Sequence, residues 1–347
     1  EKLSDWGFYI NEYFKEVCEG SYQGSTVLTP KSGYHDVPVG CLDFQSLYPN
    51  IIREQNIDFS TINLTEKLMK CPSHFISSDL GVVEFASSFE GVLPRLEAEL
   101  LAERKKVKKQ MKAATGKKKA ILNKRQLLIK KLCNSVYGFT GVSAGRLPLR
   151  KLAASITARG REMIEQTKAE CERLGYEVVY GDTDSVMPKI QGTVQHAWKT
   201  LLELEDHFAT FFTNKAIVLE AEKVYYPYLI METKKRYIGR AFENPNDLTS
   251  FKLDTKGIEM QRTDSTLLMK EFQKGVIDCI MPPQYDANIT IMSCQTNLLE
   301  LIRDYCQKII DNQFPIKYYI LSKTAKANYK GSLPEHMVVF NLRNKRV

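Results

Sequence analysis

The sequence lacks any long hydrophobic run. A membrane-spanning helix needs about 18 or more consecutive apolar residues, whereas apolar stretches such as 224–231 are interrupted by Pro227 and by tyrosines. The sequence therefore predicts a protein without a membrane-spanning helix.

The cysteines lack the spacing of a disulfide scaffold or a zinc site. There are eight of them, with no C-x-x-C pair, and the five histidines do not cluster with them. Structural zinc sites and small disulfide-rich scaffolds both need closely spaced ligands or cysteines, so we expect free thiols in a reducing compartment. The chain also begins at Glu1 rather than Met and shows no signal segment, which favours a piece of a larger or processed protein.

What is present is a globular composition. The 347 residues are 43% hydrophobic and 26% charged, as in ordinary folded domains. This length predicts two or three substructures around a sizeable core.

The excess positive charge is concentrated in one segment. Residues 102–131 contain thirteen lysines and arginines and a single acid, Glu103, a net charge of +12; since the whole chain carries +8, the remainder carries −4. Gly91 and Pro94 mark a helix start, and the Thr-Gly-Lys at 115–117 interrupts the pattern, so residues 91–141 are predicted to form a hairpin of two helices that protrudes from a body of opposite charge. A solvated helix pair or a targeting run is the alternative.

Segments on either side of this hairpin have the pattern of strands. Val37–Asp43 is a short apolar run that ends in a carboxylate, and 177–187 contains two apolar stretches around a Gly-Asp-Thr-Asp turn, which predicts a β-hairpin with acids at its tip. Further along the chain we expect helices at 151–174 and 196–212, strands at 218–225 and 228–232, and a mostly helical substructure after Arg262.

Three aspartates can meet if these strands share a sheet. Asp43 ends the first strand, and Asp182 and Asp184 lie at the hairpin tip. Clustered carboxylates raise one another's pKa unless a cation neutralises them, and carboxylate oxygens suit Mg²⁺, of which two ions would serve an in-line phosphoryl displacement. An isolated Asp-x-Asp that only stabilises a turn is the alternative.

The basic helices could complement such a site. Arg104 and Lys108 are four residues apart and share a helical face, as do Lys130, Asn134 and Tyr137. Cationic faces turned toward a metal-bearing floor indicate polyphosphate binding.

Several motifs in one order resemble those of family B DNA polymerases. They are Asp43-Phe-Gln-Ser-Leu-Tyr-Pro-Asn50, Lys130-Lys-Leu-Cys-Asn-Ser-Val-Tyr-Gly138, Tyr180-Gly-Asp-Thr-Asp-Ser185 and Lys234-Lys-Arg-Tyr237, with Gly91-Val-Leu-Pro before Arg104-x-x-x-Lys108, and Lys256-Gly-x-x-x-x-Arg262. The resemblance spans about 22–262, and the stretch from Ile320 to the C-terminus resembles part of the thumb. Phe139-Thr-Gly-Val and Glu222-Lys-Val-Tyr-Tyr-Pro-Tyr resemble the delta-type and herpesvirus-like branches, which makes a large double-stranded DNA virus the expected source.

The resemblance implies an α+β right-hand polymerase core. Its palm is an antiparallel β-sheet formed by 1–90, with the first catalytic Asp, and 149–262, with the second Asp pair; the fingers are the helical hairpin 91–148; and 263–347 is an incomplete, mostly helical thumb. The implied reaction adds deoxynucleotides from dNTPs to a primer 3′ end and releases pyrophosphate.

The resemblance also implies roles for individual residues. Asp43, Asp184 and the Phe44 carbonyl would hold two Mg²⁺ ions, with Asp182 supporting them. Tyr48 would exclude a ribose 2′-hydroxyl, although a core aromatic is the alternative, and Lys130 would protonate the leaving pyrophosphate. The implied nucleotide contacts are Ser46, Leu47, Tyr48, Arg104, Lys108, Lys130 and Asn134. The implied contacts to primer-template DNA are Tyr137, Gly138, Lys234, Lys235, Arg236, Tyr237, Lys256 and Arg262, although a Lys-Lys-Arg run can also be a solvated strand end.

The sequence departs from the family pattern in three respects. Asn50 stands where the family often has Ser, Pro334-Glu-His336 matches the thumb motif loosely, and no Asp-x-Glu exonuclease constellation or C-terminal cysteine cluster is found. Proofreading is therefore not predicted for this segment, and a processivity factor is expected to bind outside it.

Two other classes of function stay open on sequence alone. One is a non-catalytic polymerase-like scaffold that binds DNA, and the other is a basic nucleic-acid-binding module with incidental acids. The expected location is the nucleus, the host nucleus for a viral protein, with a cytoplasmic virus factory as the alternative.

Overall fold

The computed structural model describes residues 21–64, 68, 70–142, 148–281, 291–322 and 337–339. The first twenty residues of the predicted palm and most of the stretch that resembles the thumb, including Pro334-Glu-His336, lie outside these ranges.

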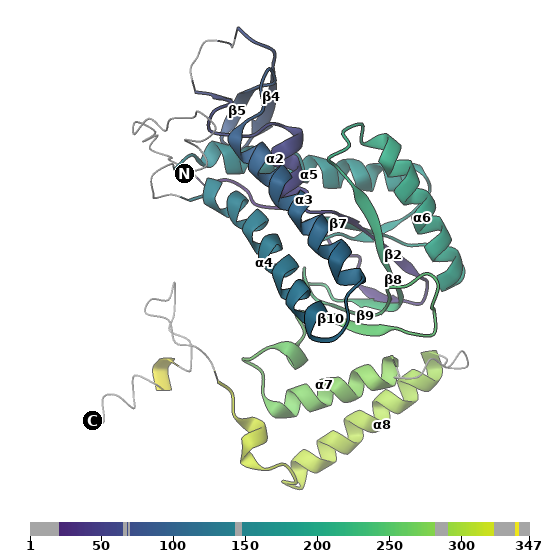
Figure 1. The fold of residues 1–347 in the computed structure, drawn as a ribbon. Coiled ribbons are helices and arrows are strands. Elements are labelled where there is room, and N and C mark those ends of the chain that lie inside the picture. Colours follow the sequence, from purple (N-terminus) through teal and green to yellow (C-terminus); the bar gives the residue numbers. More distant parts are fainter. Residues whose placement is uncertain are drawn as a thin grey trace.

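The described chain is a mixed α+β fold built on an antiparallel sheet (Figure 1). The sheet has the order β10-β9-β8-β2-β7-β6, and β1 also pairs with β8. Its strands are β1 (Gly33–His35), β2 (Val39–Phe44), β6 (Val178–Tyr180), β7 (Ser185–Pro188), β8 (Leu219–Ile230), β9 (Tyr237–Phe242) and β10 (Lys252–Lys256). This agrees with the expected α+β class and antiparallel sheet.

A second, smaller sheet and the helices surround this sheet. The small sheet has the order β3-β5-β4, formed by β3 (Ile62–Asn63), β4 (Ser73–Ser78) and β5 (Gly81–Ala86). The helices are α2 (Leu47–Glu54), α3 (Val92–Lys112), α4 (Gly116–Thr140), α5 (Arg150–Arg173), α6 (Val194–Phe211), α7 (Leu267–Ile280) and α8 (Ile291–Ile310), with short 3₁₀ turns at Glu259–Gln261 and Ile316–Tyr319. None of the described helices combines the length and apolar character needed to cross a bilayer.

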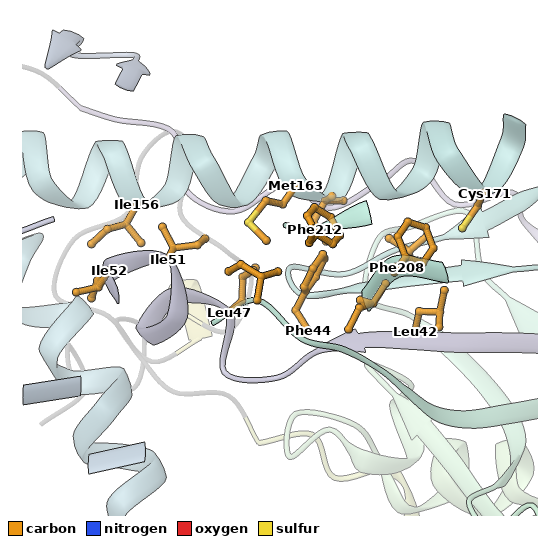
Figure 2. Close-up of a cluster of buried hydrophobic side chains, with 14 of the residues drawn as sticks. Leu42, Phe44, Leu47, Ile51, Ile52, Ile156, Met163, Cys171, Phe208 and Phe212 are labelled. Carbon is orange, nitrogen blue, oxygen red and sulfur yellow. The ribbon is translucent and has the colours of Figure 1, made fainter. Parts of the chain in front are cut away.

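One face of the main sheet forms the principal core. Side chains alternate between the two faces of a strand, so Leu42 and Phe44 of β2 point away from Asp43. Both are buried against α5 and α6, where Met163 and Phe208 join them (Figure 2). Asp43 is thereby held on the face opposite to the α5 and α6 layer.

The strand β8 differs from the expected pattern. We expected two separate stretches, whereas the structure has one strand of twelve residues that passes through Pro227. The pairing with β9 shifts register between Tyr225 and Tyr228, and these two rings stack with their centroids 4.4 Å apart. A bulge lets the strand continue where proline cannot donate a ladder hydrogen bond.

The basic hairpin folds as predicted, but it does not stand clear of the body. Helices α3 and α4 pack on each other through Val107, Leu122 and Ile129, and Gly116, with a φ of +55°, begins α4 at the tip. The expectation of a protruding arm is corrected, because Arg104 Nη1 donates to Ser46 Oγ at 3.1 Å and α3 also packs on α2.

The interface between α3 and α4 buries a carboxylate. Glu97 is fully buried, and burial raises its pKa to about 7, offset in part by Cys133 and Arg53. The Cys133 thiol is a weak donor, and within the described ranges the two carboxylate oxygens have no other hydrogen-bond partner. An ionised Glu97 is therefore destabilising.

We expect Glu97→Gln to remove a pH dependence of stability. The unfolded carboxyl ionises above its ordinary pKa of 4.5 and the folded one only near 7, so the wild type loses stability as pH rises between these values. The variant should exceed it by up to about 3 kcal/mol above pH 7 and match it near pH 4. Denaturant titrations at several pH values measure this. Glu99→Gln on the exposed side of α3 is the control, and identical pH profiles for wild type and Glu97→Gln would contradict the assignment.

Candidate active site

Two aspartates that are distant in the sequence meet at the end of β2. Asp43 pairs with Ser185, the residue that follows Asp184. The Phe44 N–H donates to the Asp184 carbonyl oxygen at 2.7 Å, which holds the β6–β7 turn against the end of β2. The antiparallel pairing thus brings together Asp43, Phe44 and Asp184, as the sequence predicted.

Each of these two aspartates makes the other harder to ionise, so a bound cation would stabilise the ionised pair. Burial, the charge of Asp184 and the charge of Glu222 raise the pKa of Asp43 to about 8, against the lowering effect of Lys223 and Lys130. Burial and Asp182 raise the pKa of Asp184 as well. Two carboxylates and a backbone carbonyl form an all-oxygen donor set, which fits Mg²⁺.

Asp182 is placed differently from the other two aspartates. Its Oδ1 lies 3.0 Å from Lys235 Nζ and accepts a hydrogen bond from Thr183 Oγ1 at 3.0 Å. Across the described ranges, no three His, Cys, Asp or Glu side chains gather as a ready metal group. The three aspartates therefore do not form one group, and the placement of Asp182 beside the Asp43–Asp184 pair is compatible with the supporting role that the resemblance implies for it.

Strand β8 adds charged residues that sequence reasoning missed. Glu220 lies opposite Asp43, and Lys223 lies opposite Cys41. Lys223 Nζ contacts Glu222 at 3.4 Å and Asp254 at 3.2 Å, which provides a fixed cation beneath the carboxylates. The alternating acids of Leu-Glu-Ala-Glu-Lys at 219–223 could have indicated a strand with a charged face. Only the strand pairing shows which residues that face lies opposite.

The turn after β2 provides free backbone donors. Ser46 has a φ of +51° and precedes α2, and Asn50 Nδ2 donates to the Gln45 carbonyl oxygen at 2.6 Å, which fixes the turn. Within the described residues, the N–H groups of Ser46 and Leu47 have no protein acceptor. Free N–H groups at a helix start attract anions. Asn50, which stands where the family often has Ser, therefore stabilises this turn.

The basic helices face this turn. Besides its bond to Ser46, Arg104 keeps a buried Nε without an acceptor in the described part of the chain. Burial and the charge of Arg104 lower the pKa of Lys108. Lys130 is exposed, yet its charge lowers the pKa of both Asp43 and Asp184. Asn134 is exposed one turn further along α4.

An aromatic pair closes one side of the site. The rings of Tyr48 and Tyr137 lie with centroids 4.4 Å apart, and burial raises the pKa of both hydroxyls. A Cβ at Gly160 of α5 would lie 3.2 Å from Tyr48 Cε1, so the bare glycine lets α5 approach the ring. Gly138, in contrast, has open space where a Cβ would point.

Most of the predicted DNA contacts are engaged with the protein itself. Lys234 Nζ donates to the Val27 carbonyl oxygen at 2.6 Å, and Arg236 pairs with Glu259. Farther along, Arg262 pairs with Asp264 at 2.8 Å, and Lys256 is exposed at the end of β10.

Tyr237 departs from the expectation. Only 6% of it is exposed, and its ring packs among Tyr180, Tyr225 and Tyr228. The Tyr237 side chain therefore has a core role in the sheet, and the DNA contact of the Lys234–Tyr237 cluster stays a prediction.

Comparisons with known proteins give one consistent result. A family model described as DNA polymerase family B matches residues 6–347. The chain is 42% identical over 267 residues to the DNA polymerase delta catalytic subunit of Arabidopsis thaliana, which covers 73% of this chain and 24% of that protein. The identity is 39% over 319 residues to the DNA polymerase delta catalytic subunit of Candida albicans, covering 84% and 29%. It is 35% over 345 residues to the DNA polymerase of Paramecium bursaria Chlorella virus NY2A, covering 94% and 36%. The chain thus spans about a quarter to a third of the length of these relatives.

Proposed function

Because this chain belongs to DNA polymerase family B, we propose that it carries out template-directed DNA synthesis from deoxynucleoside triphosphates. The observation that carries the proposal is the pairing of β2 with the turn before β7, which sets Asp43 beside Asp184 beneath the cationic helices α3 and α4. The same observation disfavours a non-catalytic scaffold, which would not need to retain two mutually repelling, partly buried carboxylates.

Each part of the fold takes one task in this proposal. The main sheet, from 1–90 and 149–262, is the palm that holds the reaction centre. The hairpin within 91–148 forms the fingers that close over the triphosphate, and 263–347 forms the thumb that follows the duplex.

Asp43, Asp184 and the Phe44 carbonyl would hold two Mg²⁺ ions. When bound, the ions polarise phosphoryl oxygens and stabilise the charge that develops in the transition state. Asp182 contributes indirectly, because its pairing with Lys235 orients the turn that carries Asp184.

The chain's other residues position the triphosphate. The Ser46 and Leu47 N–H groups and the guanidinium of Arg104 bind phosphate oxygens, with Lys108 as a further cation. The primer 3′-hydroxyl gives up its proton to solvent, and its oxygen attacks the α-phosphorus as the bond from the α-phosphorus to the oxygen of the β-phosphate breaks. Lys130 donates a proton to the departing pyrophosphate, and Asn134 faces the bound nucleotide.

Primer-template DNA is the macromolecular partner in this proposal. Tyr137 and Gly138 border the nascent base pair, where the open space beside Gly138 leaves room for it. Lys234, Lys235 and Arg236 exchange their present protein partners for phosphates, and Lys256 and Arg262 follow the backbone. Such contacts bind most sequences alike and weaken with salt.

Primer extension with and without Mg²⁺ tests the proposed activity. We expect extension only with the divalent cation and all four deoxynucleotides, and loss of extension on chelation, while binding to a primer-template persists. Extension that survives chelation would refute the metal assignment. Binding to the primer-template without any extension in Mg²⁺ would favour the scaffold. DNA binding that never depends on nucleotide, again without extension, would favour a basic binding module.

The wider setting follows from the relatives. A delta-type or viral replication role implies work in a nucleus, the host nucleus for a viral protein, with a virus factory in the cytoplasm as the alternative. A processivity factor would bind outside this segment.

A further inference from the structure

The turn that carries Asp184 has a strained backbone. Thr183 has a φ of +63°, a conformation that residues with a branched Cβ rarely adopt. Such a residue costs about 1–3 kcal/mol and persists only where its surroundings hold it in place. The Thr183 side chain donates to Asp182 Oδ1 at 3.0 Å, but this bond lies within the turn itself. The position of Asp184 therefore depends on contacts that reach the turn from outside.

A segment that precedes β1 makes such contacts. We name residues 23–28 the bracing segment. The Thr183 N–H donates to the Thr26 carbonyl oxygen at 3.1 Å. The Leu28 N–H donates to the Gly181 carbonyl oxygen at 2.9 Å, and a Cβ at Gly181 would lie only 2.8 Å from Leu28 Cδ1, so the glycine lets the segment approach closely. The bracing segment thus holds the turn on both sides of Asp182.

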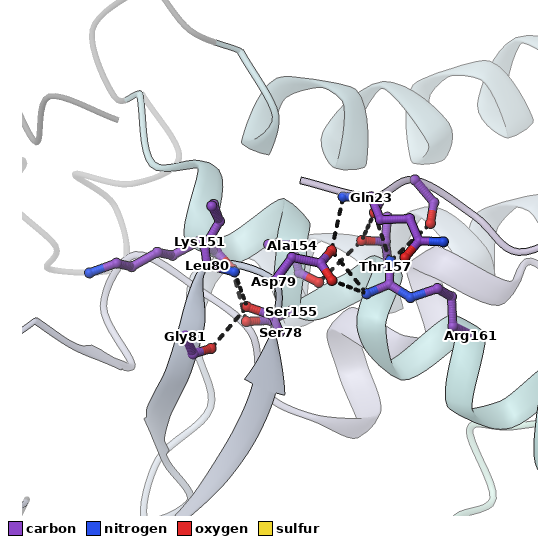
Figure 3. Close-up of polar contacts among 11 residues, drawn as sticks. Gln23, Ser78, Asp79, Leu80, Gly81, Lys151, Ala154, Ser155, Thr157 and Arg161 are labelled. Atoms are coloured by element: carbon purple, nitrogen blue, oxygen red, sulfur yellow. Dashed lines mark hydrogen bonds and ion pairs between the residues drawn. The ribbon is translucent and has the colours of Figure 1, made fainter. Parts of the chain in front are cut away.

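Arg161 of α5 anchors the start of the bracing segment (Figure 3). Its Nη1 donates to the carbonyl oxygens of Gln23 at 2.7 Å and Gly24 at 3.0 Å. Its Nη2 lies 3.1 Å from Asp79 Oδ2, an oxygen that also accepts from the Gln23 N–H at 2.9 Å. Thr157, also on α5, donates through Oγ1 to the Gln23 carbonyl oxygen at 3.0 Å. Because the Arg161 side chain is only 13% exposed, its charge-assisted bonds are stronger than neutral ones and little weakened by solvent.

A second cation holds the other end of the bracing segment. Lys234 Nζ donates to the Val27 carbonyl oxygen at 2.6 Å, and Val27 forms an isolated antiparallel bridge with Asp182. In the proposed function, Lys234 exchanges this partner for a DNA phosphate. The Arg161 anchor is then the side-chain contact that continues to hold the segment while DNA is bound.

We propose that Arg161 and Asp79 are positioning residues for Asp184 that act through the bracing segment. The inference rests on the proposed function, in which Asp184 is a metal ligand. Asp79 fixes the guanidinium of Arg161, the guanidinium fixes the start of the segment, and the segment holds Thr183 in its left-handed conformation. Loss of the anchor lets the turn relax toward an unstrained φ, which moves the Asp184 carboxylate away from Asp43.

Two measurements test this proposal. The first is the Mg²⁺ concentration that gives half of the full rise in melting temperature, without DNA or nucleotide. The second is single-nucleotide insertion on a primed template, analysed as kcat and as KM for the deoxynucleotide. We expect Arg161→Gln to raise the Mg²⁺ midpoint and to lower kcat, each about threefold to tenfold, as for the loss of one or two hydrogen bonds. KM for the deoxynucleotide and the affinity for primer-template should stay within about twofold of wild type, because the groups proposed to bind phosphates are unchanged.

Further variants separate positioning from folding. Asp79→Ala should shift both quantities in the same direction as Arg161→Gln, and the double variant should add little to either single variant. Arg161→Lys, which keeps a cation that can donate to a carbonyl oxygen of the segment, should recover part of the loss. Arg173→Gln loses a carboxylate pair at the far end of α5, and Ser78→Ala loses hydroxyl bonds within the β4–β5 turn. These two are the matched controls, and both should keep the wild-type kcat and Mg²⁺ midpoint.

A milder variant covers the case in which Arg161→Gln does not fold. Thr157 is fully buried, and Thr157→Val removes one bond to the bracing segment while keeping the shape of the side chain. It should lower kcat about threefold with KM unchanged, and a wild-type kcat for a folded Thr157→Val would overturn the proposal in that case.

The outcomes distinguish this inference from the proposed function. If Asp184→Asn abolishes extension while Arg161→Gln and Asp79→Ala keep the wild-type kcat and Mg²⁺ midpoint, the inference fails and the proposed function stands. If Arg161→Gln instead raises KM or weakens DNA binding at an unchanged kcat, the bracing segment acts on the substrates and not on the turn, so the inference is wrong. If Asp184→Asn extends primers as well as wild type, the metal assignment and this inference fail together.

Discussion

Replacing Asp184 with asparagine should reduce primer extension by about a thousandfold or more. Metal-assisted charge stabilisation contributes several kcal/mol to such reactions, and each 1.36 kcal/mol is a factor of ten in rate. DNA affinity should change little, because the substitution beside Asp43 leaves unchanged the cationic side chains proposed to contact the DNA phosphates.

The same substitution should stabilise the metal-free fold. Asp184 raises the pKa of Asp43 to about 8 together with burial, so at neutral pH the two carboxyls oppose each other's ionisation. Asparagine removes that repulsion. Thermal unfolding in a chelator should therefore show a higher melting temperature for Asp184→Asn than for wild type, and Mg²⁺ should raise the melting temperature of wild type more than that of the variant.

Asp206→Asn is the matched control for both measurements. Asp206 is exposed on α6, which packs on the opposite face of the sheet. Equal extension by wild type and Asp184→Asn would refute the site assignment. A destabilised Asp184→Asn would show instead that Asp184 acts mainly as a structural acceptor.

Replacing Tyr48 with alanine should admit ribonucleotides. Removing the ring opens the space beside Tyr137 and Gly160, and the ratio of deoxynucleotide to ribonucleotide insertion should fall about a hundredfold, as for sites that discriminate by shape. Alkali sensitivity of the extended primer reports incorporated ribonucleotides directly.

The control for this prediction is a tyrosine-to-alanine substitution away from the candidate site. Tyr34→Ala removes a partly exposed tyrosine from β1 of the main sheet, whereas Tyr48 lies on α2, and it should leave sugar selection unaltered. An alkali-resistant product from an active Tyr48→Ala enzyme would show that another group excludes the 2′-hydroxyl.

Local patterns were sufficient for much of the fold. The helix start at Gly91 and Pro94 and the break at Gly116 predicted the α3–α4 hairpin, and the Gly-Asp-Thr-Asp turn predicted the β6–β7 hairpin, because helix and turn formation depend on nearby residues. The long strand β8 was missed, since a proline and a bulge disguise it and only its neighbours β2 and β9 supply the pairing.

The sequence predicted only part of the candidate site, because strand pairing brings some of its residues into place. Asp43 and Asp184 stood out as acids at strand ends, whereas Glu222 and Lys223 gained meaning only through their position across from β2. Tyr237 was assigned to DNA because Lys234-Lys-Arg-Tyr237 resembles a family motif, and only the structure shows that three other tyrosines bury its ring. Burial is a property of the whole sheet and not of the neighbouring residues.

By itself, the sequence determined the family, the order of the chemical motifs and the location of the positive charge, because these depend on residue types and short spacings. Tertiary structure decided which carboxylates meet and which cations serve the protein instead of a ligand. Those relations join residues as far apart as Phe44 and Asp184, or Val27 and Lys234, and such contacts exist only after the long-range pairing of strands and helices has brought them together.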